Sequence, residues 1–160
     1  MKTTKKYWTE QVRGRPVKVY AQSTEAKSSP LSAPASAKIT SFATYQDLTS
    51  YCKCRNNGGS ENGCYAKGDS GIGAWGDITG QRKTPMCALL PQAMINRFGS
   101  SRAARGKKVR VFIDGIDGSV ICECRDKGPN GVCDLNPAAL RVFGLPEDME
   151  LNRSGRWEWA

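Results

Sequence analysis

Histidine is absent from all 160 residues of the sequence. Its absence excludes Ser-His-Asp and Cys-His catalysis and removes imidazole as a general base or metal ligand. Catalytic groups would therefore come from Asp, Glu, Lys, Tyr or Cys. Long apolar runs are also missing, so no segment has the length of a membrane-spanning helix. We expect neither a cofactor nor a transmembrane segment.

Acidic residues are scarce relative to basic ones, with 15 Asp and Glu against 24 Lys and Arg, a net charge of +9. This balance favours an anionic partner such as nucleic acid, an acidic membrane or an acidic cell-wall polymer. The basic residues are dispersed and are not interleaved with aromatics in a recognisable module. We therefore expect no nucleic-acid partner.

Seven cysteines are many for a small cytosolic protein, and they predict a disulfide framework with one thiol left over in a monomer. Each Cys-x-Cys pair would place both sulfurs on one face of a strand. We favour disulfides over a four-thiolate zinc site and expect no metal, because Cys-x-x-Cys is the more usual zinc spacing. The disulfide candidates are Cys52, Cys54, Cys64, Cys87, Cys122, Cys124 and Cys133.

The N-terminal part differs in composition from the rest. Residues 22–37, "QSTEAKSSPLSAPASA", are typical of a linker, so we assign residues 1–37 to a basic arm with a linker and residues 38–160 to one folded domain. Within the arm, "RPVKVYA" is either a strand that docks on the domain edge or part of a disordered basic tail. The N-terminus has no apolar h-region of a secretory signal.

Two segments of the domain resemble each other, "CALLPQAMINRFG" from Cys87 and "CDLNPAALRVFG" from Cys133. Each predicts a short helix with proline in its first turn and a glycine stop, and Asn136 is a good N-cap for the second. Upstream, "YCKCRNNGGSENGC" similarly echoes "ICECRDKGPNGVC". These similarities indicate a duplicated domain.

Runs rich in β-branched and aromatic residues predict strands at 38–45, 106–115, 118–125 and 155–160, and residues 112–121 predict a hairpin. The domain is therefore expected to be mainly β, built from two similar halves with one short helix each. A closed barrel is a natural way to pair every strand edge.

The stretch "VICECRDKGPNGVCDLNPAALRVFGL", together with "GIGAWGD" and "TPMCALLPQAM", resembles the double-psi β-barrel group. This group includes rare lipoprotein A, expansins, barwin and the endoglucanases of glycoside hydrolase family 45. The resemblance covers residues 38–160 and implies a six-stranded double-psi β-barrel with two or more short helices. The chain departs from rare lipoprotein A at Ala88, which stands where that family has histidine, and at Lys127, which replaces its turn arginine.

The resemblance identifies Asp126 as the catalytic carboxylate, with Gly128 and Pro129 fixing the loop so that Asp126 faces an open groove. A carboxylic acid with a raised pKa can protonate the leaving oxygen of a glycosidic bond. The same turn is also common where Asp only hydrogen-bonds the backbone.

Inverting hydrolysis needs a second carboxylate across the substrate. Asp77 matches the position of the catalytic glutamate of rare lipoprotein A, and Asp47 resembles the base of family 45. Either one is equally consistent with a turn or cap residue. A lytic transglycosylase needs only one acid/base group, because the muramic sugar's own hydroxyl attacks, and Asp126 alone would serve.

The aromatic residues Trp75, Tyr45 and Tyr65 would stack on sugar rings or belong to the barrel core. Lys127 is a further substrate-binding candidate. We expect a monomeric enzyme that cleaves cell-wall glycan, as a peptidoglycan lytic transglycosylase or endoglycosidase. The alternative is a non-catalytic barrel that binds or loosens wall glycan, or inhibits a protease. Either protein would act outside the cytoplasm, in the periplasm or extracellularly. Because no signal peptide is visible, we expect it to be phage-encoded or delivered by a secretion system.

Overall fold

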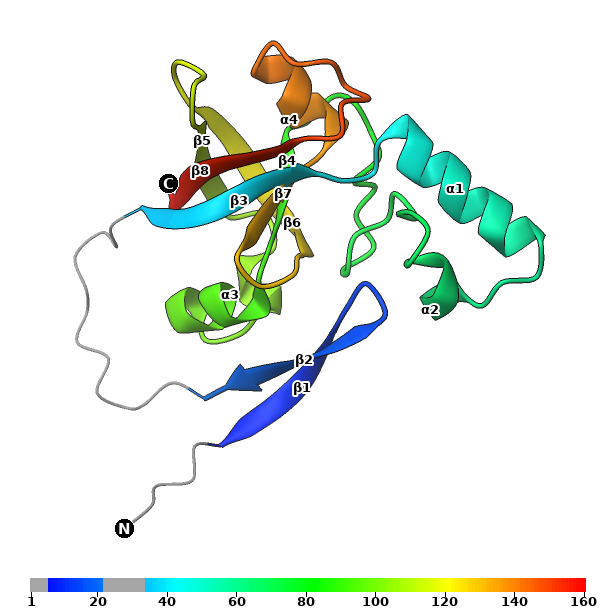
Figure 1. Cartoon of the computed structure of the whole chain (residues 1–160). Coiled ribbons are helices and arrows are strands. Elements are labelled where there is room, and N and C mark those ends of the chain that lie inside the picture. Colours follow the sequence, from blue (N-terminus) through cyan, green and yellow to red (C-terminus); the bar gives the residue numbers. More distant parts are fainter. Residues whose placement is uncertain (1–5, 22–33) are drawn as a thin grey trace.

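A closed barrel of six strands forms the centre of the computed structural model, which describes residues 6–21 and 34–160 (Figure 1). Around the barrel the strand order is β3-β7-β4-β6-β5-β8. The strands are β3 (Ala35–Ser41), β4 (Met86–Leu89), β5 (Lys108–Ile113), β6 (Val120–Lys127), β7 (Val132–Leu135) and β8 (Asn152–Trp159). The prediction of a mainly β protein with a six-stranded barrel and short helices is confirmed. Most of the predicted linker lies outside the described residues.

Strand directions in the barrel are mixed. β3 runs parallel to β7 and β4 runs parallel to β6, whereas the other neighbours are antiparallel. The short strand β4 lies between β6 and β7, and its residue Ala88 is paired with Asp126 on one side and with Asp134 on the other. The topology therefore brings two aspartates to the same level of the barrel from the two strands that flank β4.

The two predicted short helices are confirmed. α3 (Pro91–Phe98) follows β4, and α4 (Pro137–Val142) follows β7. Each helix begins with proline, which is pre-organised for a first turn and needs no N–H partner there. The side chain of Asn136 accepts the N–H of Ala139 as an N-cap, and Gly99 ends α3 in the left-handed conformation with φ of 82°.

The upstream cysteine segment does not repeat the barrel strands. Cys52 and Cys54 lie in α1 (Tyr45–Asn56), so the prediction that they share a strand face is wrong; Cys64 ends α2 (Glu61–Cys64). The cause is local: Thr44 and Asp47 form a reciprocal capping box that starts α1 just after β3. The predicted strand at 38–45 therefore stops at Ser41.

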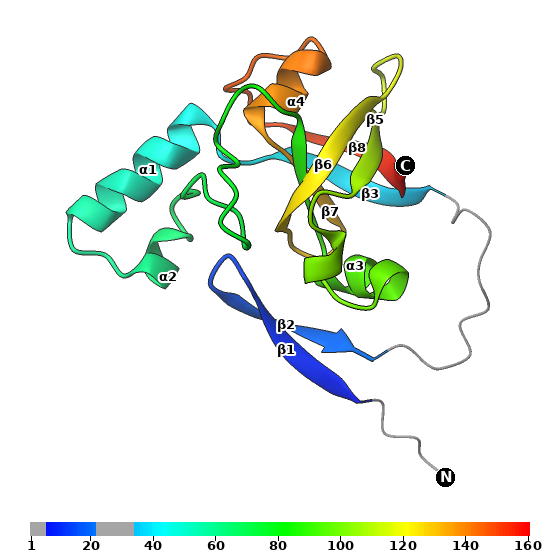
Figure 2. The same ribbon diagram turned by 180° about the vertical axis from the view of Figure 1, so that it is seen from behind.

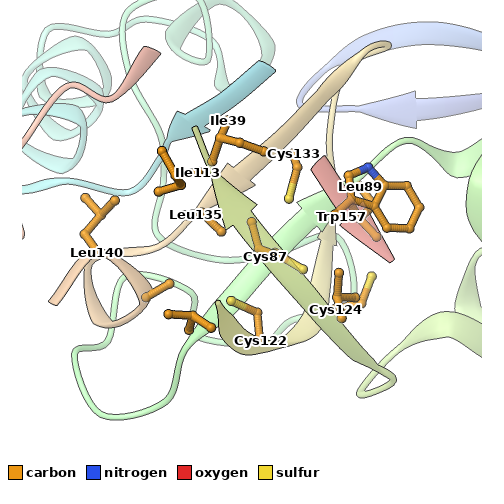
Figure 3. Packing of buried hydrophobic residues seen from close by; sticks show 14 of the residues in the cluster. Ile39, Cys87, Leu89, Ile113, Cys122, Cys124, Cys133, Leu135, Leu140 and Trp157 are labelled. Atoms are coloured by element: carbon orange, nitrogen blue, oxygen red, sulfur yellow. The ribbon is translucent and has the colours of Figure 1, made fainter. Parts of the chain in front are cut away.

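The barrel interior is apolar and contains four cysteines together with branched aliphatic residues (Figure 3). At one end Trp159 packs edge-on against Phe98 of α3 and against Trp157, with ring centroids 4.8 and 5.4 Å apart. Burying one large aliphatic or aromatic side chain completely stabilises the folded state by about 1.5–3 kcal/mol relative to leaving it exposed. The barrel is thus a rigid base for the loops at its edge.

A separate hairpin of β1 (Tyr7–Val12) and β2 (Arg15–Tyr20) lies beside α3 (Figures 1 and 2). The predicted strand in the arm is confirmed as β2, although it pairs with β1 and not with a barrel strand. The connecting residues Arg13 and Gly14 have φ of 47° and 71°, the two positive angles that a two-residue type I′ turn requires. In the described part of the chain, no helix is long and apolar enough to cross a membrane.

Candidate functional site: an acidic cluster beneath the N-terminal hairpin

Asp126 lies near the end of β6 and is only 4% exposed. Its Oδ1 accepts main-chain hydrogen bonds from the N–H groups of Ala74 and Lys127, each at 2.7 Å. The turn that follows packs on β4, because a Cβ atom at Gly128 would lie 3.1 Å from the carbonyl oxygen of Ala88. Glycine at this position therefore lets the turn approach β4 closely and fixes the orientation of Asp126.

Two further buried aspartates lie near Asp126, and we call Asp69, Asp126 and Asp134 the acidic cluster. Asp134, on β7, accepts a hydrogen bond from the hydroxyl of Thr40 on β3 and is 3% exposed. Asp69, in the loop after α2, is 6% exposed, and its Oδ1 accepts the N–H of Gly71 at 2.7 Å. Barrel strands and a loop thus contribute carboxylates to one buried site.

The hairpin turn inserts Arg13 into the acidic cluster. Its Nη1 lies 2.7 Å from Oδ2 of Asp134, and its Nε lies 3.6 Å from Oδ2 of Asp69 and 3.9 Å from Oδ2 of Asp126. The guanidinium carbon also lies 4.8 Å from the ring centroid of Phe42, a cation–π contact. One cation therefore serves three carboxylates.

The rest of the hairpin makes few polar contacts with the body of the protein. Lys127 Nζ lies 2.8 Å from Oε2 of Glu10 on β1. The side-chain amide of Gln92 on α3 both accepts the main-chain N–H of Tyr20 at 2.9 Å and donates to its carbonyl at 3.1 Å. These contacts hold the hairpin over the end of β6.

Burial raises the pKa of Asp126 to about 6, and the positive charge of Arg13 opposes part of that rise. Burial likewise raises the pKa of Asp69 and of Asp134, again against Arg13. Burial disfavours the charge on Arg13, but the carboxylates outweigh it and raise the pKa of Arg13. Because one guanidinium compensates three acids, the acidic cluster holds protons more tightly than isolated aspartates do.

Among the described residues, Asp126 does not face the open groove that was expected, since its side chain is buried. The loop is fixed as expected, but the carboxylate lies under the hairpin, with Arg13 against its second oxygen. The reason is that the N-terminal arm, assigned outside the domain, folds back onto the barrel edge.

The two predicted partner acids have other contacts. Asp77 forms a two-pronged ion pair with Arg105, with both N···O distances at 2.9 Å, and lies 3.2 Å from Nη1 of Arg125. The hydrogen bond from Arg105 lowers the pKa of Asp77. Asp47 closes the capping box of α1, where its Oδ2 accepts the N–H and hydroxyl of Thr44 at 3.2 and 3.0 Å. The carboxylates that face Asp126 across Arg13 are instead those of the acidic cluster.

The predicted sugar-binding aromatics occupy three different surroundings. Tyr45 is 65% exposed at the start of α1. Trp75 is half-buried and packs against the barrel core, and Tyr65 is half-buried with its ring centroid 5.1 Å from that of Tyr51. Their roles in sugar binding stay predictions.

Among the disulfide candidates, the structure pairs Cys54 with Cys64 and thereby joins α1 to α2. The other five are thiols: Cys52 is exposed, and Cys87, Cys122, Cys124 and Cys133 are buried in the barrel. Hydrogen bonding with Cys124 and Cys133, together with burial, raises the pKa of Cys87. In the described ranges no group of three or more Cys, Asp or Glu is arranged to hold a metal ion.

Sequence reasoning missed Arg13, Asp69 and Asp134 as site residues. For Asp134 a signal existed, since it lies within the segment that resembles the double-psi barrels. For Arg13, the Arg-Gly pair between two strand-like runs is a hairpin signal. No local pattern indicates that this turn would reach an aspartate more than 100 residues away.

No known family model matches this chain, and no curated protein matches its sequence. The assignment of function therefore depends on the fold and on the geometry of the acidic cluster.

Proposed function

We propose that the protein is a glycan-cleaving enzyme of the double-psi β-barrel group that acts on peptidoglycan, with Asp126 as general acid. A closed six-stranded barrel of mixed strand direction with short helices is compatible with that group. The net charge of +9 favours association with an acidic wall polymer. The disulfide between Cys54 and Cys64 is consistent with action outside the cytoplasm.

The proposal is carried by the environment of Asp126, whose carboxyl group is buried, held by main-chain N–H groups and raised in pKa. A general acid must hold a proton at working pH and lose it in the reaction, so a pKa of about 6 suits the task. Main-chain N–H groups bind Oδ1 and fix the carboxyl plane, so Oδ2 remains as the oxygen that can carry the proton. An acidic residue that only closed a turn would not require this burial.

A second carboxylate for hydrolysis is available within the acidic cluster. Asp126 and Asp134 are paired with the same residue of β4, Ala88, and both carboxylates lie against Arg13, 3.9 and 2.7 Å from its nitrogens. Inverting hydrolysis requires two carboxyl groups with room for a water molecule between them, the place that the guanidinium occupies here. We propose Asp134 for that role and retain Asp77 and Asp47 as the other candidates. A lytic transglycosylase would use Asp126 alone.

The test is digestion of purified peptidoglycan followed by mass spectrometry of the products. Because Arg13 covers Asp126, the wild-type protein and Arg13→Ala are both assayed, each with and without Asp126→Asn. Asp117→Asn, an exposed aspartate in the β5–β6 turn, is the matched control. We expect anhydro-muropeptides or new reducing ends only where Asp126 is intact. Absence of products from every protein, or equal release from the Asp126→Asn proteins, would contradict the proposal.

A second candidate function is non-catalytic, either binding of wall glycan or inhibition of a protease. The observation that favours it is that Asp126 is 4% exposed and contacted by Arg13, an arrangement that a barrel without catalytic duty can retain. Co-sedimentation with peptidoglycan that survives Asp126→Asn, with no products released, would favour this function.

A further inference from the structure

We propose that the N-terminal hairpin is an intramolecular inhibitor that closes the acidic cluster, with Arg13 as the inserted group. Its catalytic consequence rests on the proposed function, whereas the closure itself does not. A general acid must come within hydrogen-bond distance of the leaving oxygen, about 2.6–3.2 Å. The Nε of Arg13 lies 3.9 Å from Oδ2 of Asp126, so the guanidinium occupies the position that a substrate oxygen needs.

The hairpin can leave without dismantling the barrel. Its two strands pair with each other, whereas the six barrel strands close their own sheet. Its polar anchors include Arg13 in the acidic cluster, Glu10 on Lys127, and Tyr20 on Gln92. Val12 and Val19 of the hairpin are also buried. A two-stranded hairpin is marginally stable by itself. Undocking is therefore a local opening with a lower free-energy cost than global unfolding.

Docking leaves polar atoms of Arg13 unsatisfied. In the described part of the chain, its Nε and Nη2 are buried without a hydrogen-bond partner. These atoms lower the net gain from inserting Arg13, which favours a reversible contact over a permanent one. The gain comes from compensating three buried carboxylates and from burying Val12 and Val19 of the hairpin, so docking depends in part on the residues that we assign to the site.

Carboxyl labelling tests the closure without reference to any substrate. The full-length protein is treated with a water-soluble carbodiimide and glycine ethyl ester, and modification of Asp126 over time is followed by mass spectrometry. The exposed Asp114 is the internal reference. We compare the wild-type protein with Arg13→Ala and Glu10→Gln, and Arg15→Ala, the exposed neighbour on β2, is the matched control.

We expect Asp126 to be labelled at least about tenfold faster in Arg13→Ala than in the wild type, because the labelling rate follows the open fraction. Glu10→Gln keeps the guanidinium but weakens the second anchor, so a smaller increase there reports opening of the hairpin itself. It also serves as the test if Arg13→Ala fails to fold, as judged by circular dichroism. Arg15→Ala should match the wild type. Equal rates for Asp126 in all folded variants, or a wild-type rate equal to that of Asp114, would overturn the closure.

Peptidoglycan digestion by the same proteins separates the two proposals. Faster labelling of Asp126 in Arg13→Ala, with no cleavage by any variant, would support the closure and contradict the proposed enzyme. Cleavage by wild type at the rate of Arg13→Ala would overturn inhibition and leave the enzyme proposal standing. Faster cleavage by Arg13→Ala that is lost on adding Asp126→Asn would support both.

Discussion

Asp126 and Asp77 are linked by one loop yet have opposite environments. The loop binds Asp126 through the N–H of Ala74, and three residues later it carries Asp77. Asp77 has two arginines for one carboxylate, and its pKa is lowered, chiefly by the hydrogen bond from Arg105. Asp126 shares one arginine with two other acids, and burial raises its pKa to about 6.

The opposite pKa shifts of Asp77 and Asp126 show how the surroundings that the fold creates give two identical side chains different proton affinities. A carboxylate next to two arginines stays ionised and cannot donate a proton near neutral pH. A buried carboxylate that shares one arginine with two other acids can hold a proton at that pH and donate it. Asp77 thus has the environment of a structural ion pair, and Asp126 has that of an acid catalyst.

The largest difference is expected in activity. Asp126→Asn removes the proton donor and should lower the rate of glycan cleavage by about 10²–10⁴-fold. Asp77→Asn removes an ion pair without touching the donor and should lower the rate by less than about tenfold. Both rates are measured by release of muropeptides in the Arg13→Ala background. Equal losses in the two variants would break the contrast.

The next effect is on stability as a function of pH. The folded-state pKa of Asp126 is raised above its ordinary value of 3.8, so its stabilising contribution is complete below that value and is lost as pH rises through about 6. At about 1.4 kcal/mol per pKa unit, the wild-type protein should lose about 3 kcal/mol over this interval relative to Asp126→Asn. Urea unfolding of both proteins between pH 3.5 and 7 measures it. A flat difference would contradict the raised pKa.

Asp77 should show the opposite pH dependence with a smaller amplitude. Its folded-state pKa is lowered, so its contribution is present above the ordinary value of 3.8 and is lost as pH falls through the folded-state pKa. We expect Asp77→Asn to lower the free energy of unfolding by about 1 kcal/mol at pH 7 and by nothing once the carboxylate is protonated. Urea titrations at neutral and acidic pH report the change. A loss that persists in acid would assign the effect to packing.

The smallest effect concerns Asp47, whose carboxylate belongs to a helix cap. Thr44→Ala removes the capping side chain of α1 and should lower the free energy of unfolding by about 1 kcal/mol. Thr49→Ala, in the next turn of the same helix, is the control. Thermal unfolding by circular dichroism compares them. If Asp47→Asn lowered activity more than Asp126→Asn, Asp47 would have a role in the reaction and not only in the helix cap.

The two short helices that follow β4 and β7 were predictable from local patterns, whereas the six-stranded count of the barrel came from the family resemblance. Pro91 and Pro137 at helix starts and Gly99 at a helix end are each decided within a few residues. The same kind of local signal also explains the error at Cys52 and Cys54, where the Thr44–Asp47 cap establishes a helix that the cysteine spacing did not reveal.

The acidic cluster was only partly predictable. Asp126 was identified through the resemblance to the double-psi β-barrel group. Its pKa depends on burial under the hairpin, whose Arg13 lies against the carboxylate. Ion pairs between such distant residues leave no periodic signature in a single sequence. For the arm, the strand was one of two alternatives that the sequence left open, and the structure contains it as β2. The position of the hairpin over the site is a tertiary property.

The most direct test of the account is a titration of the Asp126 carboxyl carbon by NMR in the wild-type protein, assigned by comparison with Asp126→Asn. We expect a midpoint near pH 6, well above that of Asp77 in the same spectra. A midpoint at or below the ordinary 3.8 would show an ionised carboxylate at neutral pH and would contradict its role as proton donor.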